Sequence, residues 1–77
     1  MLTTAEKPKN VVDKLKEWRK EMSRKYSVAP YLILSDKAII DLSIKMPMER
    51  YDLKEVYGMG PSKISRYGDQ ILDVLHN

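Results

Sequence analysis

The chain has 77 residues, of which 43% are hydrophobic and 32% are charged, and its formal net charge at pH 7 is +3. These values are typical of one small globular domain, which has room for a core but little room for a deep active-site cleft. The absence of cysteine excludes disulfides and thiolate zinc and fits a reducing compartment. We find neither an apolar run near the roughly 20 residues of a membrane span nor a signal-peptide pattern. We therefore expect an intracellular protein without membrane contact.

The charge is distributed unevenly along the chain. Residues 1–30 contain eight Lys and Arg against four Asp and Glu, whereas residues 31–77 contain six against seven. A basic first third favours binding to nucleic acid or to anionic lipid. Residues 1–10, MLTTAEKPKN, are polar and include a proline, so they predict a linker or leader segment before a folded domain at residues 11–76.

The first predicted helix follows Asn10, a suitable cap, and extends to about Tyr26. Its apolar residues recur at steps of four, three and four, which places them on one face: Val11, Leu15, Trp18 and Met22. A basic stripe at i, i+4 spacing lies on the outer surface: Lys16, Lys20 and Arg24. An acidic stripe lies beside it: Asp13, Glu17 and Glu21. Two interpretations stay open, namely a solvated face with weak ion pairs and a phosphate-facing edge that continues into Lys25.

The segment SVAPYLILSD, residues 27–36, predicts a loop because Pro30 disfavours helical angles in the residue before it. Ser35 or Asp36 is a suitable cap for a second helix that extends to about Met46. Four apolar residues of this helix share one face: Ala38, Ile39, Leu42 and Met46. Ile40 and Ile44 lie nearly opposite, so we expect this helix to be central in the bundle.

Pro47 ends the second helix and starts a short turn, which is counted as the third helical element, and two further helices are predicted after it. Asp52 caps a brief helix that ends at Gly58, with Glu55 completing a variant capping box. The last helix runs from Pro61 to about Leu75 and buries an apolar face: Ile64, Tyr67, Ile71 and Leu75. Gly68 near this face predicts close packing against another helix. With no strand pattern, the fold class is all-α, a compact bundle of about five helices, two of them very short.

A glycine hairpin precedes the last helix, where Gly58 and Gly60 flank Met59. Free amides at a helix N-terminus, with Lys63 and Arg66 in the first two turns, suit a phosphate site. The alternative, which we favour, is a structural corner that turns one helix into the next and points Met59 into the core.

Groups that carry out catalysis are scarce in this chain. Its one histidine is His76, and its carboxylates are spread singly over helix surfaces without a metal-ligand spacing. The sequence GMG lacks the pattern of a nucleotide-binding loop. We therefore expect a non-catalytic domain without metal or cofactor.

Five short motifs occur in order over one domain length: WR at 18–19, PY at 30–31, SD at 35–36, MP at 46–47, and GMGPSK followed by RYG at 58–68. Together they make residues 11–75 resemble the HRDC domain, which is named for RecQ-type helicases and RNase D. The pieces PYLILSD and GMGPSK fit the RecQ-type pattern better than that of RNase D. The resemblance implies a helical, non-catalytic module of an ATP-dependent DNA helicase whose motor lies upstream. It also narrows the expected location to the cytoplasm and nucleoid, or to the nucleus of a eukaryote.

Many members of this family bind single-stranded or branched nucleic acid weakly, and the resemblance implies the loop after the first helix as the surface. That places Tyr31 there, with Lys25 before it and Lys37 after it. An exposed tyrosine can stack a base while lysines hold phosphates, but Tyr31 can also be a core plug beneath the loop. The expected DNA-binding residues are Lys16, Lys20, Arg24, Lys25, Tyr31 and Lys37. Lys63 and Arg66 are expected as a secondary contact to the nucleic-acid backbone.

Two functions remain open. The first is an accessory module of a RecQ-type helicase, monomeric, that binds single-stranded or branched DNA weakly. The alternative is a protein-interaction or architectural module that docks on the parent helicase core or on a partner and has little DNA affinity. The acidic stripe of the first helix and the slightly acidic remainder of the chain keep this alternative open.

Overall fold

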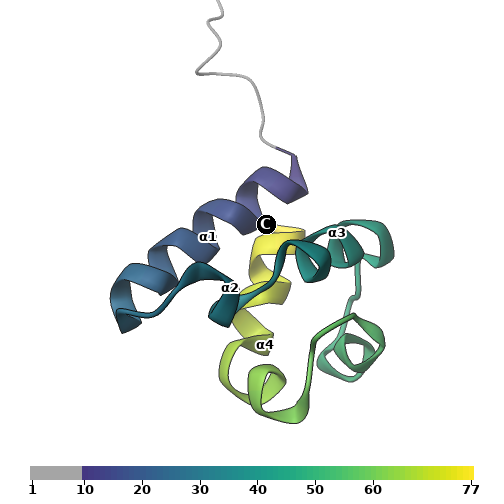
Figure 1. Ribbon diagram of the computed structural model, residues 1–77. Helices are drawn as coiled ribbons and strands as arrows, with labels where there is room; N and C mark the ends of the chain where they lie inside the picture. The colour runs from purple at the N-terminus through teal and green to yellow at the C-terminus, as the bar shows by residue number, and fades with distance from the viewer. Residues whose placement is uncertain (1–9) are drawn as a thin grey trace, which may run out of the picture.

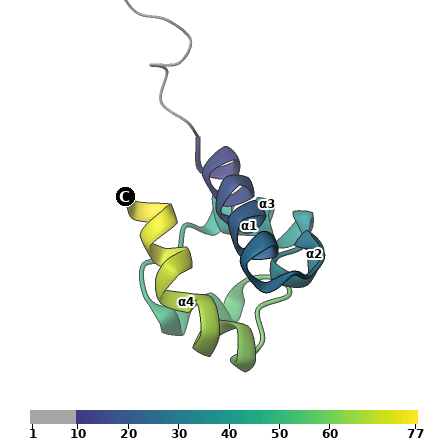
Figure 2. The same ribbon diagram turned by 90° about the vertical axis from the view of Figure 1, so that its left-hand side faces the viewer.

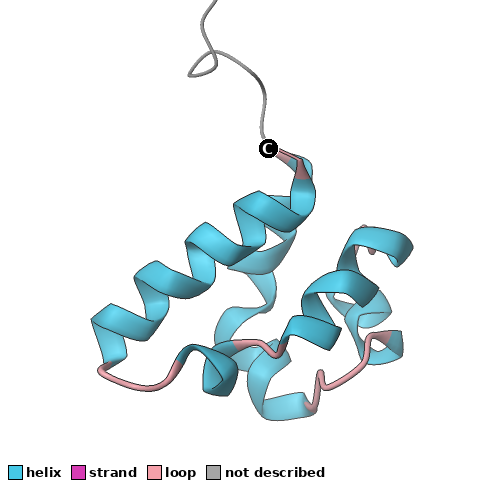
Figure 3. Cartoon of the chain, turned by 45° about the horizontal axis from the view of Figure 1, so that its top comes forward, coloured by secondary structure: helices cyan, strands magenta, loops and turns pink. Residues whose placement is uncertain are grey.

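The computed structural model describes residues 10–77, and helices joined by short loops account for that whole range (Figures 1 and 3). In chain order they are α1 (Val11–Tyr26), α2 (Pro30–Ile33), α3 (Asp36–Lys45), the 3₁₀ helix η2 (Arg50–Glu55) and α4 (Pro61–His76). For this range the predicted all-α class with five helices, two of them short, is confirmed. Of the linker expected at residues 1–10, only Asn10 belongs to the described residues.

α1 is the centre of the packing, since it contacts α2, α3 and α4, while η2 packs against α4. α4 returns along α1, and its C-terminal end lies near the N-terminal half of α1 (Figures 1 and 2). Trp18 of α1 and Tyr67 of α4 meet edge to face, with ring centroids 5.7 Å apart. The core joins all five helices and the hairpin: Leu15, Trp18, Met22, Ile33, Leu34, Ala38, Ile39, Leu42, Leu53, Val56, Met59, Tyr67, Ile71 and Leu75.

The ends of the long helices follow the predicted capping residues. The Asn10 side chain accepts a hydrogen bond from the Asp13 amide at 2.9 Å, and the Ser35 side chain accepts one from the Ala38 amide at 3.1 Å. Both caps satisfy amides that a first helical turn leaves without an intrahelical partner. α1 ends at Ser27, which takes up a left-handed conformation. The predicted boundaries of α1 and α3 are thus confirmed to within a residue or two.

The short segments differ from the prediction at several places. Pro30 does not lie in an irregular loop, because it opens the one-turn helix α2, where its fixed φ suits the first position. The prediction that Asp52 caps a helix is wrong. Its amide donates to the Glu49 carbonyl at 3.0 Å, so Asp52 already lies inside η2, which ends at Glu55 and not at Gly58. The short turn expected at Pro47 is likewise absent, because residues 46–48 form neither a helix nor a turn.

α3 is not the central helix that its two apolar sides suggested. Its inner side is buried through Ala38, Ile39 and Leu42, but Ile40 is 49% exposed and Ile44 is 73% exposed. The expectation fails because α1 packs on one side of α3, whereas Ile40 and Ile44 on the opposite side stay largely in solvent.

The glycine hairpin is a corner, with Met59 buried at 7% exposure. Gly58 has φ +74°, which a side chain disfavours, whereas Gly60 has an ordinary extended backbone and caps α4. Within α4, a β-carbon on Gly68 would lie 3.3 Å from a methyl of Leu53. The close packing expected at Gly68 is confirmed, and its partner is η2.

Candidate nucleic-acid interface

The segment between α1 and α3 is fixed onto α1 by polar contacts. The guanidinium of Arg19, whose side chain is only 15% exposed, donates to the Leu34 carbonyl at 2.9 Å and to the Asp36 carboxylate at 2.8 Å. The Ser23 hydroxyl donates to the Val28 carbonyl at 2.6 Å. Arg19 also holds the pKa of Asp36 below its ordinary value through its hydrogen bond and its charge. α2 is therefore a positioned element of the surface and not a free loop.

Tyr31 stands on this positioned helix with its side chain in solvent. It is 67% exposed, and within residues 10–77 it makes no ring contact or side-chain hydrogen bond. The alternative that Tyr31 plugs the core is therefore wrong, because Ile33 and Leu34 fill the core beneath the segment. An aromatic face that is open to water and carried on a fixed helix is available for stacking.

The basic stripe of α1 is fully on the surface, since Lys16, Lys20 and Arg24 are all exposed. Lys16 is close enough to Asp36 to favour its charged form and so to lower its pKa, which places the start of the stripe beside the α2–α3 junction. Positions 16, 20 and 24 follow one another by one helical turn on neighbouring parts of the same face. The start of the stripe, at Lys16, therefore lies on the side of α1 that carries α2.

Lys25 and Lys37 do not join this stripe. Lys25 follows Glu21 by four positions and so shares the acidic side of α1, with its ammonium 5.6 Å from the Tyr26 ring centroid. Lys37, in the first turn of α3, places its ammonium 4.9 Å from the ring centroid of Tyr57. The six expected residues therefore lie on separate elements: the stripe and Lys25 on α1, Tyr31 on α2 and Lys37 on α3.

The secondary cations lie at the start of α4. Lys63 is half-buried and Arg66 is exposed. The neighbouring Tyr67 packs against Tyr26 at the end of α1, with ring centroids 6.3 Å apart. This contact brings the first turns of α4 to the same end of the bundle as Lys25.

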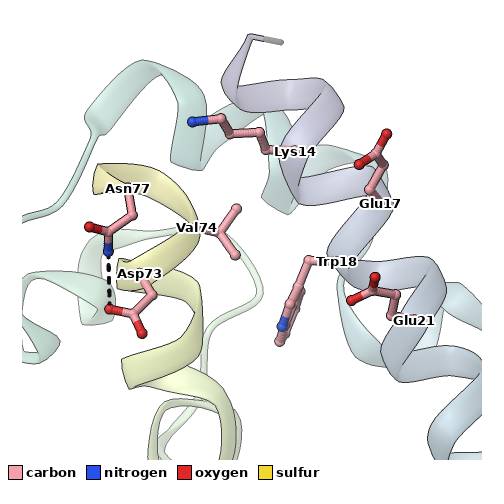
Figure 4. Close-up of a pocket in the computed structure, with 7 residues that line it drawn as sticks. All are labelled: Lys14, Glu17, Trp18, Glu21, Asp73, Val74 and Asn77. Carbon is pink, nitrogen blue, oxygen red and sulfur yellow. Dashed lines mark hydrogen bonds between the residues drawn. The ribbon is translucent and has the colours of Figure 1, made fainter. Parts of the chain in front are cut away.

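The side of α1 that faces α4 is acidic. A groove between α1 and α4 has Trp18 and Val74 on its walls (Figure 4). Its polar lining is mostly anionic: Lys14, Glu17, Glu21, Asp73 and Asn77. Charge repulsion disfavours phosphates in such a groove.

One exposed aromatic residue that contacts an expected site residue was missed by sequence reasoning. Tyr57 is 53% exposed and is paired with Lys37, although the two are twenty positions apart. The position of Tyr57 directly before the glycine hairpin was the one sequence feature that could have indicated exposure. A tyrosine at such a position is, however, equally typical of a core residue.

Residues 10–77 contain no group of three His, Asp or Glu side chains that could hold a metal ion. His76 Nε2 lies 2.7 Å from the Pro47 carbonyl oxygen, so the imidazole tethers the end of α4. No helix in the described part of the chain is long and apolar enough to span a membrane.

Comparison with known proteins decides the family. The family model described as HRDC domain matches residues 9–75, which is most of the chain. The chain belongs to the HRDC domain family. Its fold matches the solved structure "D. radiodurans RecQ HRDC domain 3" with a TM-score of 0.82 and 26% identity, over 86% of this chain and 87% of that one. The expected family and fold are confirmed.

Curated relatives of this HRDC domain are helicases. The ATP-dependent DNA helicase RecQ of Bacillus subtilis is 30% identical over 73% of the chain, and that of Haemophilus influenzae is 22% identical over 87%. The ATP-dependent DNA helicase UvrD2 of Mycobacterium tuberculosis is 26% identical over 79%. The chain covers 11% of the Haemophilus protein, 10% of the Bacillus protein and 9% of UvrD2. The chain therefore corresponds to an accessory module of RecQ-type helicases and spans about a tenth of those relatives.

Proposed function

We propose that this HRDC domain binds single-stranded or branched DNA weakly, as an accessory module of an ATP-dependent DNA helicase of the RecQ type. The observation that carries the proposal is Tyr31, two-thirds exposed on a helix that Arg19 fixes beside the basic stripe of α1. The relatives' names as DNA helicases support DNA as the ligand. The domain would work as a monomer inside the cell, attached to its helicase core.

The chemistry of this face suits single strands. A base that stacks on an exposed aromatic ring gains about 1 to 3 kcal/mol without depending on its sequence. The neighbouring Lys16, Lys20 and Arg24 would hold the phosphates and release counterions, which makes the affinity depend on salt. Since α2 is already fixed on α1, binding does not have to order it. A face with one aromatic ring and three cations implies weak binding, which would help the helicase core to stay bound to single-stranded DNA.

The other expected residues take lesser roles in this proposal. Lys25 extends the contact past the end of α1, and Lys37 extends it toward the hairpin. Lys63 and Arg66 would add a backbone contact where a branched substrate reaches the start of α4.

The test is a titration of fluorescent single-stranded and forked oligonucleotides with the purified domain at low and moderate salt. A double variant, Lys20→Gln with Arg24→Gln, should weaken binding and lower the salt slope by about 0.7 for each phosphate of the single strand that is no longer neutralised. The matched control, Lys14→Gln with Lys54→Gln, removes equal charge away from the stripe and should have a smaller effect. If the unsubstituted domain shows no detectable binding to either oligonucleotide at low salt, the proposal is wrong.

A further inference from the structure

An apolar strip lies on the outer face of α3 and on the start of the hairpin. It consists of Ile40 at 49% exposure, Ile44 at 73% and Tyr57 at 53%. Ile40 and Ile44 are four positions apart, so their side chains lie one above the other along α3. Tyr57 and Ile40 line one hollow together with Lys37 and Asp41. The strip therefore has both a ridge and a depression next to it.

The strip is held in place before any partner arrives. The Tyr57 amide donates to the Asp41 carboxylate at 2.8 Å. The Lys45 ammonium pairs with the same carboxylate at 3.0 Å and also donates to the Glu55 carbonyl. These contacts tie the segment after η2 to α3. A preformed surface loses little conformational entropy when it binds.

The edge of the hollow carries a cation, Lys37. Asp41 is balanced by Lys45, and Asp36, the sequence neighbour of Lys37, is bound by Arg19. Lys37 makes no ion pair within residues 10–77 and instead lies over the Tyr57 ring. The hollow is thus apolar inside and positive at its edge, which complements a partner with an apolar side chain beside a carboxylate.

We propose that this strip docks an amphipathic helix of a partner protein that presents two apolar side chains one turn apart, with an Asp or Glu beside them. One apolar side chain enters the hollow between Ile40 and Tyr57, the second packs on Ile44, and the carboxylate pairs with Lys37. This accounts for the second apolar side of α3, which the helices of residues 10–77 leave in water. DNA fits less well, because phosphates gain nothing from two isoleucines.

Selection from a displayed library of helical peptides, each about 15 residues long, tests the proposal. The immobilised domain should enrich peptides with apolar residues at i and i+4 and an acidic residue next to them. An enriched peptide should shift the NMR methyl signals of Ile40 and Ile44. Its affinity should fall roughly tenfold in Ile44→Ser, which removes a buried apolar side chain from the interface, and also in Lys37→Gln. Tyr51→Ser is the matched control, because Tyr51 is 72% exposed and lies outside the strip.

Four outcomes would overturn the proposal. The enriched peptides could bind Ile44→Ser as tightly as the unsubstituted domain, or the enriched pool could be basic. Single-stranded DNA, and not a peptide, could shift the methyl signals, or the domain could self-associate in a way that Ile44→Ser abolishes. The last two would assign the strip to nucleic acid or to a second copy of the chain. Oligonucleotide affinity of Ile44→Ser should match that of the unsubstituted domain, so this inference and the DNA-binding proposal can fail separately.

Discussion

Arg19 and Asp36, seventeen positions apart, are joined by an ion pair of 2.8 Å, and the same guanidinium nitrogen donates to the Leu34 carbonyl at 2.9 Å. The pair connects the middle of α1 to the start of α3 across α2. Arg19 is nearly buried while Asp36 is 80% exposed at its side chain, so the arginine is the more consequential partner.

We predict that Arg19→Ala lowers the free energy of unfolding by about 1 to 3 kcal/mol, because it leaves the part-buried Leu34 carbonyl without its donor. Asp36→Asn removes only the solvent-exposed half of the interaction and should cost less. Urea denaturation of both variants measures the difference. A larger loss in Asp36→Asn than in Arg19→Ala would contradict the assignment of the carbonyl hydrogen bond as the important one.

Two carboxylates, those of Asp36 and Asp41, should make the stability of the domain depend on pH in the acidic range. The pKa of Asp36 is lowered by the hydrogen bond and charge of Arg19, and that of Asp41 by the Tyr57 amide and by Lys45. Because the carboxyl pKa is lower in the folded domain than in the unfolded chain, ionisation of the carboxylate stabilises the fold. This stabilisation is fully present at a pH above the unfolded-chain pKa, about 3.9, and is lost as the pH falls through the lower pKa of the folded domain. We expect thermal stability to be constant from neutral pH to about 5 and to fall below about 4.

Asparagine variants test the origin of this acid dependence. Asp41→Asn should flatten the stability curve below about pH 4, since the amide side chain does not titrate in that range. Melting curves recorded over the pH series give the comparison. A curve for Asp41→Asn parallel to that of the unsubstituted domain would assign the acid loss to other carboxylates.

The two glycines of the hairpin are not equivalent. Gly58 has φ +74°, so Gly58→Ala should cost about 1 to 2 kcal/mol of stability through left-handed strain. Gly60 has φ −91° and ψ 174°, and a β-carbon added there would meet no atom within 4 Å. Gly60→Ser is the matched control and should leave stability unchanged or raise it, because serine is a preferred cap. Equal losses in urea denaturation would contradict this distinction.

Local patterns in the sequence predicted most of the fold. The Asn10 and Ser35 caps and the burial of Met59 follow from rules that act over a few residues. The predictions that failed concern contacts between elements that are distant in the sequence. Apolar residues at Ile40 and Ile44 predicted a covered helix, but periodicity shows which face is apolar and not whether another element reaches it.

The candidate site could be predicted only in part for the same reason. Residue types and spacing indicated the basic stripe of α1, which is a local feature of one helix. Whether Tyr31 faces solvent depends on Ile33 and Leu34 filling the core beneath it, and the partner of Lys37 depends on where the chain returns at Tyr57. Such contacts between distant segments are decided by tertiary packing.

The aromatic ring of Tyr31 should contribute to DNA affinity independently of charge. Tyr31→Ala should weaken single-strand binding by about 1 to 3 kcal/mol, whereas Tyr31→Phe keeps the ring and should retain most of the affinity. Fluorescence anisotropy with a short labelled oligonucleotide measures both variants. Tyr51→Ala, at a position that is 72% exposed, is the control and should bind as the unsubstituted domain does. Equal affinities for all three variants would remove stacking from the proposal.

The start of α4 should contribute less to DNA binding than the stripe of α1. Replacing Lys63 and Arg66 together with alanine should reduce the salt slope slightly and weaken forked DNA more than a plain single strand, since these residues lie on α4 and not on the stripe of α1 or on α2. Arg66 is exposed and Lys63 is half-buried, so a melting curve must first show that the variant is folded. If this pair abolished binding while Lys20→Gln with Arg24→Gln did not, the phosphates would lie at the hairpin, and the corner formed around Met59 would itself be the binding site.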